Sequence, residues 1–145
     1  MTRIDFYILD SPAREARFGV ACRLADKAVQ QRHEVLINTE ADADSERLDE
    51  LLWTFSQGSF LPHRLLADTT REDEGEPILI GSGREPGEGS WDLLINLAPK
   101  VPAFFSRFGR VAEVVGADEE SKAAGRERFR YYRDRGYELN THHNI

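Results

Sequence analysis

Five short apolar segments, separated by helical or polar stretches, constrain the fold of this chain more than any other sequence feature. They span residues 4–9, 34–38, 77–80, 92–97 and 110–115. Apolar strands alternating with helices favour a parallel sheet that is covered on both faces. A chain of 145 residues suffices for one such domain, over residues 1–145, and is too short for two.

Three segments have helical periodicity. The first begins at Ser11-Pro12, which can cap and start a helix, and runs to about residue 32. Its apolar stripe is Phe18, Cys22, Ala25 and Val29. The second covers residues 42–55, and the third covers residues 121–135. Residues 137–145 follow the third helix and are expected to form a partly flexible C-terminal tail.

The glycine-rich segment 81–89 follows a predicted strand, so a phosphate-binding loop has to be considered. It lacks the Gly-Lys-Ser/Thr ending of such loops, and Glu85 and Glu88 would repel phosphate. We expect a mobile loop like that of a β-hairpin.

No catalytic constellation is visible. The four histidines have no metal-ligand spacing with acidic or cysteine partners, so we expect neither a metal nor a cofactor. Cys22, the single cysteine, lies on an apolar helix stripe and is expected in the core. One cysteine allows no intrachain disulfide, and no signal peptide or membrane span is evident, so a cytoplasmic protein is expected.

Charge is distributed unevenly along the chain. The formal net charge is −7, which disfavours non-specific binding to DNA or anionic membranes through the whole surface. Between Lys122 and Arg135, however, six cations outnumber two anions. A basic island on an acidic body indicates a confined anionic ligand.

One face of the basic helix collects the side chains most suited to such a ligand, namely Lys122, Arg126, Phe129 and Arg133. An aromatic ring framed by cations fits a ligand that combines carboxylates with an apolar group. The alternative is that Phe129 packs inward while the arginines are merely solvated. Periodicity alone favours neither interpretation.

A second candidate surface contains Trp53, Phe60 and Pro62. Trp53 lies at the edge of the buried face of its helix, and Phe60 and Pro62 lie in a segment without regular periodicity. Exposed aromatic residues beside proline often mark protein contacts. Without further information, burial of both rings in the core is slightly favoured.

Taken together, several segments resemble the chi subunit family of bacterial DNA polymerase III, part of the clamp-loader assembly. They occur in the family's order and span nearly the whole chain. The matching stretches are Phe6-Tyr-Ile-Leu-Asp10, Arg47-Leu-Asp-Glu-Leu-Leu-Trp53, Ser59-Phe-Leu-Pro-His63, Asp92-Leu-Leu-Ile95, Arg126-Glu-Arg-Phe-Arg-Tyr-Tyr-Arg133 and Gly136-Tyr-Glu-Leu-Asn-Thr141.

This resemblance implies a three-layer α/β/α fold with a five-stranded, mainly parallel sheet, like nucleotide-binding folds but without a phosphate loop. It implies a non-catalytic, replisome-associated adaptor in bacteria that contacts DNA only indirectly and has no membrane partner. One partner would be the psi subunit of the clamp loader. The other would be the acidic C-terminal peptide of single-stranded DNA-binding protein, which ends in Pro-Phe.

The resemblance also implies roles for the two candidate surfaces. Lys122, Arg126 and Phe129 match the family's peptide-binding positions, with Arg133 on the same face. Trp53 and Phe60, with Pro62 beside them, match the positions that face psi, and a helicase-like protein could compete there. Only residues 116–120 precede the basic helix, where family members can have a longer loop, which leaves Val115 as the candidate apolar wall.

Two rival hypotheses come from other classes. A small α/β enzyme or nucleotide-binding domain would use the carboxyl ends of the parallel strands. Alternatively, the basic helix would bind nucleic acid directly, which the net charge of −7 and the small size of the patch disfavour.

Overall fold

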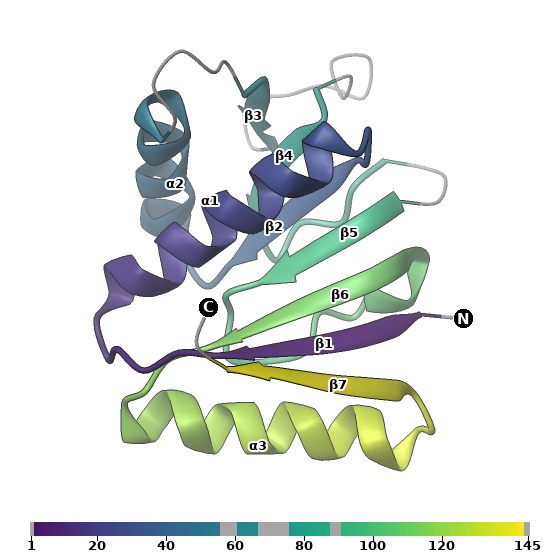
Figure 1. Ribbon diagram of the computed structural model, residues 1–145. Coiled ribbons are helices and arrows are strands. Elements are labelled where there is room, and N and C mark those ends of the chain that lie inside the picture. Colours follow the sequence, from purple (N-terminus) through teal and green to yellow (C-terminus); the bar gives the residue numbers. More distant parts are fainter. Residues whose placement is uncertain (1, 56–60, 67–75, 88–90, 144–145) are drawn as a thin grey trace.

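The computed structural model describes residues 2–55, 61–66, 76–87 and 91–143. Within these residues, all strand pairs are parallel and form one seven-stranded sheet in the order β3-β4-β2-β5-β6-β1-β7. The strands are β1 Arg3–Ile8, β2 Val35–Thr39, β3 His63–Leu65, β4 Ile78–Ser82, β5 Trp91–Asn96, β6 Phe108–Val115 and β7 Glu138–His143 (Figure 1).

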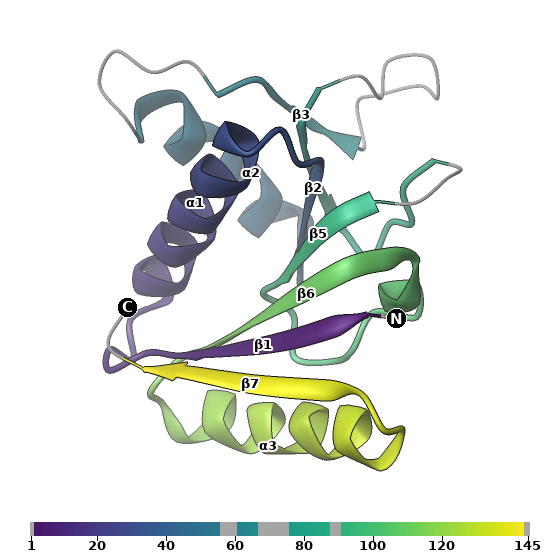
Figure 2. The same cartoon turned by 45° about the vertical axis from the view of Figure 1, so that its right-hand side comes forward.

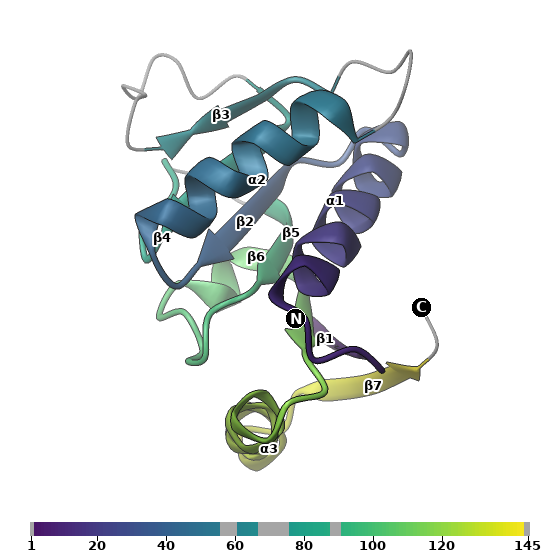
Figure 3. The ribbon, with the colours of Figure 1, turned by 90° about the vertical axis from the view of Figure 1, so that its left-hand side faces the viewer.

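Helices cover both faces of the sheet. Helices α1 (Arg14–Gln30) and α2 (Asp42–Thr54) lie side by side on one face, and α3 (Glu119–Asp134) lies apart from them on the other (Figure 3). A short 3₁₀ helix, η3 (Phe105–Arg107), precedes β6. The predicted three-layer α/β/α fold is therefore confirmed.

Two hydrophobic clusters lie on opposite sides of the sheet. The first joins residues of α1 and α2, such as Cys22 and Leu52, to alternate strand residues such as Ile37. The second joins Tyr132 of α3 to strand residues whose side chains point to the other face of the sheet, such as Phe6 and Leu36. The predicted stripe of the first helix is confirmed, because Phe18, Cys22 and Ala25 are buried and Val29 packs against the same cluster.

The prediction of five strands was wrong, because the sheet has seven. The additional strands are β3, which has only three residues, and β7, which lies in the segment expected to be a tail. Strand β7 alternates between exposed and partly buried positions and has no apolar run. Neither strand therefore has the hydrophobic pattern by which the other five were recognised.

Pairing with β1 holds the C-terminal segment in place. The register runs from Arg3 opposite Glu138 to Ile8 opposite His143. His142 stacks on Tyr7, with ring centroids 4.7 Å apart and planes 15° apart, and its Nε2 lies 2.9 Å from Asp5 Oδ1. Most of the expected tail, residues 137–145, is thus an edge strand of the sheet.

The glycine-rich segment does not form a hairpin. Strands β4 and β5, which it connects, are parallel and are separated by β2. Gly83 has a φ of +65°, a conformation that glycine adopts without steric cost, and its N–H donates to Asn38 Oδ1 at 2.9 Å. Residues 88–90 lie outside the described residues.

The starts of the helices follow simple capping chemistry. Ser11 does not cap α1 directly, because Ala13 occupies that position, but Ser11 Oγ accepts a hydrogen bond from Ala13 N at 3.1 Å. Asp118 caps α3 by accepting a hydrogen bond from Ser121 N at 3.0 Å. Among the helices of the described residues, none combines the length and hydrophobicity needed to cross a bilayer.

Gly125 sets how closely α3 can approach the sheet. A Cβ at this position would lie 3.0 Å from both Cγ atoms of Val115, a buried residue of β6. By contrast, a Cβ at Gly19, in α1, would meet no atom within 4 Å. The absence of a side chain is therefore a packing requirement at Gly125 and not at Gly19.

We expect Gly125→Ala to lower the free energy of unfolding by about 1–2 kcal/mol, because overpacking costs more than the gain in helix propensity. The matched variant Gly19→Ala should raise it by about 0.5–1 kcal/mol, because only the propensity changes. Urea denaturation monitored by circular dichroism measures both. Equal effects at the two positions would contradict the close contact of Gly125 with Val115.

Candidate functional site

Helix α3 carries the predicted peptide-binding residues, and a buried ionic contact fixes its orientation on the sheet. Arg128 Nε donates to Glu113 Oε1 at 2.7 Å, and Tyr132 OH donates to Glu113 Oε2 at 2.7 Å. The side chains of Arg128 and Glu113 are 5% and 0% exposed. Two residues one turn apart on α3 are thus hydrogen-bonded to the same carboxylate of β6.

The Glu113 carboxylate also connects neighbouring strands. Asn96 Nδ2, at the end of β5, donates to both carboxylate oxygens, at 2.9 and 3.2 Å. Asn38 Nδ2, in β2, donates to Asn96 Oδ1 at 2.9 Å. Burial raises the pKa of Glu113, while the Arg128 guanidinium and the hydrogen bonds from Tyr132 and Asn96 oppose that shift. We name Asn38, Asn96, Glu113, Arg128 and Tyr132 the Glu113 network.

Arg128 was counted in the predicted basic island, but it is a core residue. Its side chain extends inward to Glu113, and its Nη1 donates to the carbonyl of Pro99 at 3.0 Å. Sequence periodicity does not distinguish this arginine from its exposed neighbours on α3. The exposed cationic face is therefore smaller than the sequence indicated.

The three cations predicted to bind the peptide, Lys122, Arg126 and Arg133, are all exposed on α3. Within the part of the chain that the structure describes, the side chains of Lys122 and Arg126 form no ion pair. Arg133 pairs with Asp134 at 3.3 Å, and the neighbouring Arg130 pairs with Glu127 at 2.6 Å. Lys122 and Arg126 are thus available to an anionic ligand without breaking an existing pair.

Phe129 is partly buried. Its ring packs against Phe6 of β1, with centroids 5.3 Å apart, and it borders the second hydrophobic cluster. It belongs to the core boundary and not to a fully exposed surface. The partly buried Ile8 and Leu139 border the same cluster from β1 and β7.

Val115 is a poor candidate for an apolar wall. It is only 4% exposed, and Gly125 of α3 lies directly over it. Ile8 and Leu139 retain more apolar surface beside α3. Sequence reasoning missed both, because Leu139 lies in the strand β7 that it did not predict and Ile8 reads simply as part of a buried strand.

The second candidate surface lies on α2 and β3, on the far side of the sheet from α3. Trp53 is 53% exposed, and its ring contacts the buried ring of His63 with centroids 4.3 Å apart. His63 is held between the carbonyls of Leu61 and Asp49, at 2.6 and 3.1 Å. Pro62 is partly buried, and Phe60 lies outside the described residues.

The remaining candidate groups for chemistry are the single cysteine and the possible metal ligands. Cys22 is buried, and burial, with the nearby Glu15, raises the pKa of its thiol to about 11, which disfavours a nucleophilic thiolate. In the described ranges, no three His, Cys, Asp or Glu side chains are grouped so that they could hold a metal ion.

A small cavity of about 270 Å³ lies at the carboxyl ends of β5 and β6, where the rival nucleotide hypothesis would place its ligand. Glu40, Asp118 and Glu120 are among its lining residues, and they would repel phosphate. Of its three arginines, Arg128 is already bonded to Glu113 and Arg14 to Asp44, which leaves Arg17 against three carboxylates. This cavity therefore does not favour the rival hypothesis.

Loss of Arg128 should be costly. We expect Arg128→Ala to lower the free energy of unfolding by about 3–5 kcal/mol, because it leaves the Glu113 carboxylate buried without its cation. Arg130→Ala, which removes an exposed pair on the same helix, should change it by less than about 1 kcal/mol. Urea denaturation of both variants is the measurement, and similar losses would contradict the assigned role of the Glu113 network.

Two comparisons by sequence, with a family model and with curated proteins, agree on one family. The family model described as the DNA polymerase III chi subunit, HolC, matches residues 1–140. The chain is 42% identical over 142 residues to the DNA polymerase III subunit chi of Pseudomonas aeruginosa, covering 98% of this chain and 96% of that protein. It is 31% identical over 145 residues to the subunit chi of Escherichia coli, covering 97% of each.

Solved structures show the same fold in more distant proteins. The C-terminal domain of the DEAD-box protein Dbp5 matches with a TM-score of 0.68 and 15% identity, over 97% of this chain and 90% of that one. The T4 protein UvsW matches with a TM-score of 0.68 and 11% identity, over 98% of this chain and 42% of that one. At these identities the likeness concerns the fold alone.

Proposed function

The chain belongs to the chi subunit family of DNA polymerase III, and from that membership we propose that it is a non-catalytic adaptor with two separate binding surfaces. Members of this family are accessory subunits of the holoenzyme in DNA replication. One surface would bind the psi subunit of the clamp loader. The other would bind the acidic C-terminal peptide of single-stranded DNA-binding protein.

The observation that carries the peptide site is the pair Lys122 and Arg126 on α3. Both are exposed and without an ion pair among the described residues, and they precede the partly buried Phe129 on the same helix by seven and three residues. The two cations would pair with carboxylates of the peptide, and Phe129, with Ile8 or Leu139, would contact its terminal aromatic ring. Arg133 would contribute less, because Asp134 already neutralises it.

The energetics predict a weak and salt-sensitive contact. Exposed ion pairs are worth about 0.2–1 kcal/mol each, so a few of them with one aromatic contact fit a dissociation constant of roughly micromolar order. Several peptides on one coated DNA strand, joined through psi to the clamp loader, would raise the effective affinity by avidity. Contacts that exchange quickly suit a complex that moves along DNA.

The psi surface is proposed from Trp53, Phe60 and Pro62. A half-exposed tryptophan that rests on the ordered ring of His63 is a rigid aromatic anchor of the kind found at the centre of interfaces. Its position on α2, with α3 beyond the opposite face of the sheet, would let both partners bind at once (Figure 3). A helicase-like protein that competes with psi would use the same residues.

Titration with the acidic peptide tests the first surface. The double variant Lys122→Ala/Arg126→Ala should weaken binding about 2- to 30-fold, because two exposed ion pairs with the peptide, worth about 0.2–1 kcal/mol each, are lost. Raising the salt concentration should weaken binding to the parent protein and affect the variant less. Peptide affinity equal to that of the parent would eliminate the proposed site.

Co-purification with psi tests the second surface. We expect Trp53→Ala to reduce the association at least about tenfold, as loss of a buried interface anchor does. Phe60→Ala is the companion variant, and Glu50→Ala, an exposed change on α2, is the control. Unchanged association in both aromatic variants would remove this surface from the proposal, and a large fall in melting temperature would show a core role.

A further inference from the structure

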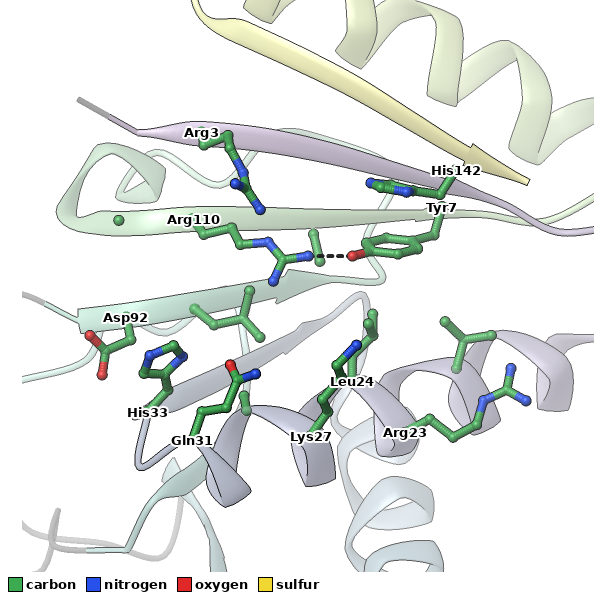
Figure 4. A pocket seen from close by; sticks show the side chains of 15 residues that line it. Arg3, Tyr7, Arg23, Leu24, Lys27, Gln31, His33, Asp92, Arg110 and His142 are labelled. Carbon is green, nitrogen blue, oxygen red and sulfur yellow. Dashed lines mark hydrogen bonds between the residues drawn. The ribbon is translucent and has the colours of Figure 1, made fainter. Parts of the chain in front are cut away.

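A cavity of about 820 Å³ lies between α1 and the sheet, on the face opposite α3 (Figure 4). Helix α1 packs against β2, β5 and β6 on this face, while β1 and β7 extend beyond it (Figure 2). The side chains of β1 on this side are polar, namely Arg3, Asp5 and Tyr7, whereas Ile4 and Phe6 on the other side are in the hydrophobic core. A volume of this size is within the range of small-molecule sites, about 300–1,000 Å³.

Cations approach this cavity from both walls. Arg3 and Arg110 belong to the sheet, and Arg23 and Lys27 belong to α1 (Figure 4). Arg23 and Lys27 are exposed and form no ion pair within the described part of the chain. The protein has a net charge of −7, so four cations around one cavity make the local charge opposite in sign to that of the whole chain.

The nearby carboxylates do not cancel these cations. Asp5 is a single carboxylate beside two guanidinium groups. Arg110 Nε lies 2.6 Å and Arg3 Nε 3.3 Å from its Oδ2. Burial opposes ionisation of Asp5, but hydrogen bonds from His142 and Arg110 outweigh it and lower its pKa, so the carboxylate is charged at neutral pH. Asp92, at one end of the cavity, accepts a hydrogen bond from Glu34 N at 2.8 Å. Four cations against two carboxylates leave a positive site.

The floor of the cavity is apolar, and its ends are polar. Leu24 of α1 is partly exposed between the cationic walls, and the buried Val20, Leu93 and Ala112 complete the apolar lining. Gln31 and His33 lie near Asp92 at one end, and the stacked rings of Tyr7 and His142 lie toward the other (Figure 4). Such a site can hold a flat, weakly polar group against its floor while charged groups face the walls.

We propose that this cavity binds a nucleotide, with its phosphates beside Lys27, Arg23 and Arg110 and its base against the apolar floor. Phosphates fit the two guanidinium groups and the ammonium, and a base fits a floor of aliphatic side chains with amide and imidazole groups at its edge. The site is near the amino ends of β5 and β6, where Asp92 and Gly109 lie, and not at the carboxyl ends. It is separate from the proposed peptide and psi surfaces.

The ligand could be a free nucleotide or part of a single DNA strand, because both present the same phosphate and base. The full chain is therefore titrated by calorimetry with thymidine triphosphate, with a short oligothymidylate and with inorganic pyrophosphate. We expect the nucleotide probes to bind more tightly than pyrophosphate, and binding to weaken as salt rises. Tighter binding of the oligothymidylate would identify a DNA strand as the source, and equal binding would identify a free nucleotide.

Matched double variants locate the site. Arg23→Ala/Lys27→Ala should lower nucleotide affinity about tenfold, whereas Lys122→Ala/Arg126→Ala removes the same charge from α3 and should leave it unchanged. For the acidic peptide we expect the opposite result: the Lys122→Ala/Arg126→Ala variant loses affinity and the Arg23→Ala/Lys27→Ala variant does not. The two proposed sites are therefore tested independently. The inference is overturned if the α1 variant retains full nucleotide affinity, if pyrophosphate binds as tightly as the nucleotides, or if the α1 variant loses the acidic peptide instead.

Discussion

The buried carboxylate of Glu113 is the interaction on which the arrangement of α3 depends. It receives hydrogen bonds from Asn96 at the end of β5 and from Arg128 and Tyr132 on α3. A charged group without exposure is tolerated only when its partners surround it. Because β5 and two positions of α3 supply those partners, the contact selects one rotation of α3, and this rotation turns Lys122 and Arg126 outward. A polar contact in the core thus determines which charges reach the surface.

The sequence predicted the strands that are continuous apolar runs. It missed the two edge strands, β3 and β7, which have no such run. Strands β1, β2, β4, β5 and β6 are buried and apolar, so composition alone indicated them. Strand β7 is polar because it lies at an edge beside β1, and β3 is too short to show a period. Edge strands are specified by tertiary contacts such as His142 on Tyr7, which no local pattern contains.

The candidate sites show a similar division. The positions of Lys122, Arg126 and Arg133 on an exposed helix face followed from helical spacing. The burial of Arg128 did not follow from helical spacing, because its partner Glu113 is on a different element, 15 residues earlier. The cavity beside α1 was also invisible to sequence analysis, since its cations come from β1, α1 and β6 and meet only in the folded sheet. Spacing finds sites on one element, and topology is needed for sites assembled from several.

The position of β1 in the sheet has a consequence for how this chain folds. Its two neighbours in the sheet are β6 and β7. In the strand register, Arg3 lies opposite Arg110 of β6 on one side and opposite Glu138 of β7 on the other. During synthesis, the first strand therefore has no partner until residues 108–115 have emerged from the ribosome. Pairings of such high contact order are slow to form, and until then β1 exposes Ile4 and Phe6. The half of the sheet that carries α3 should therefore be the last to complete its strand pairing.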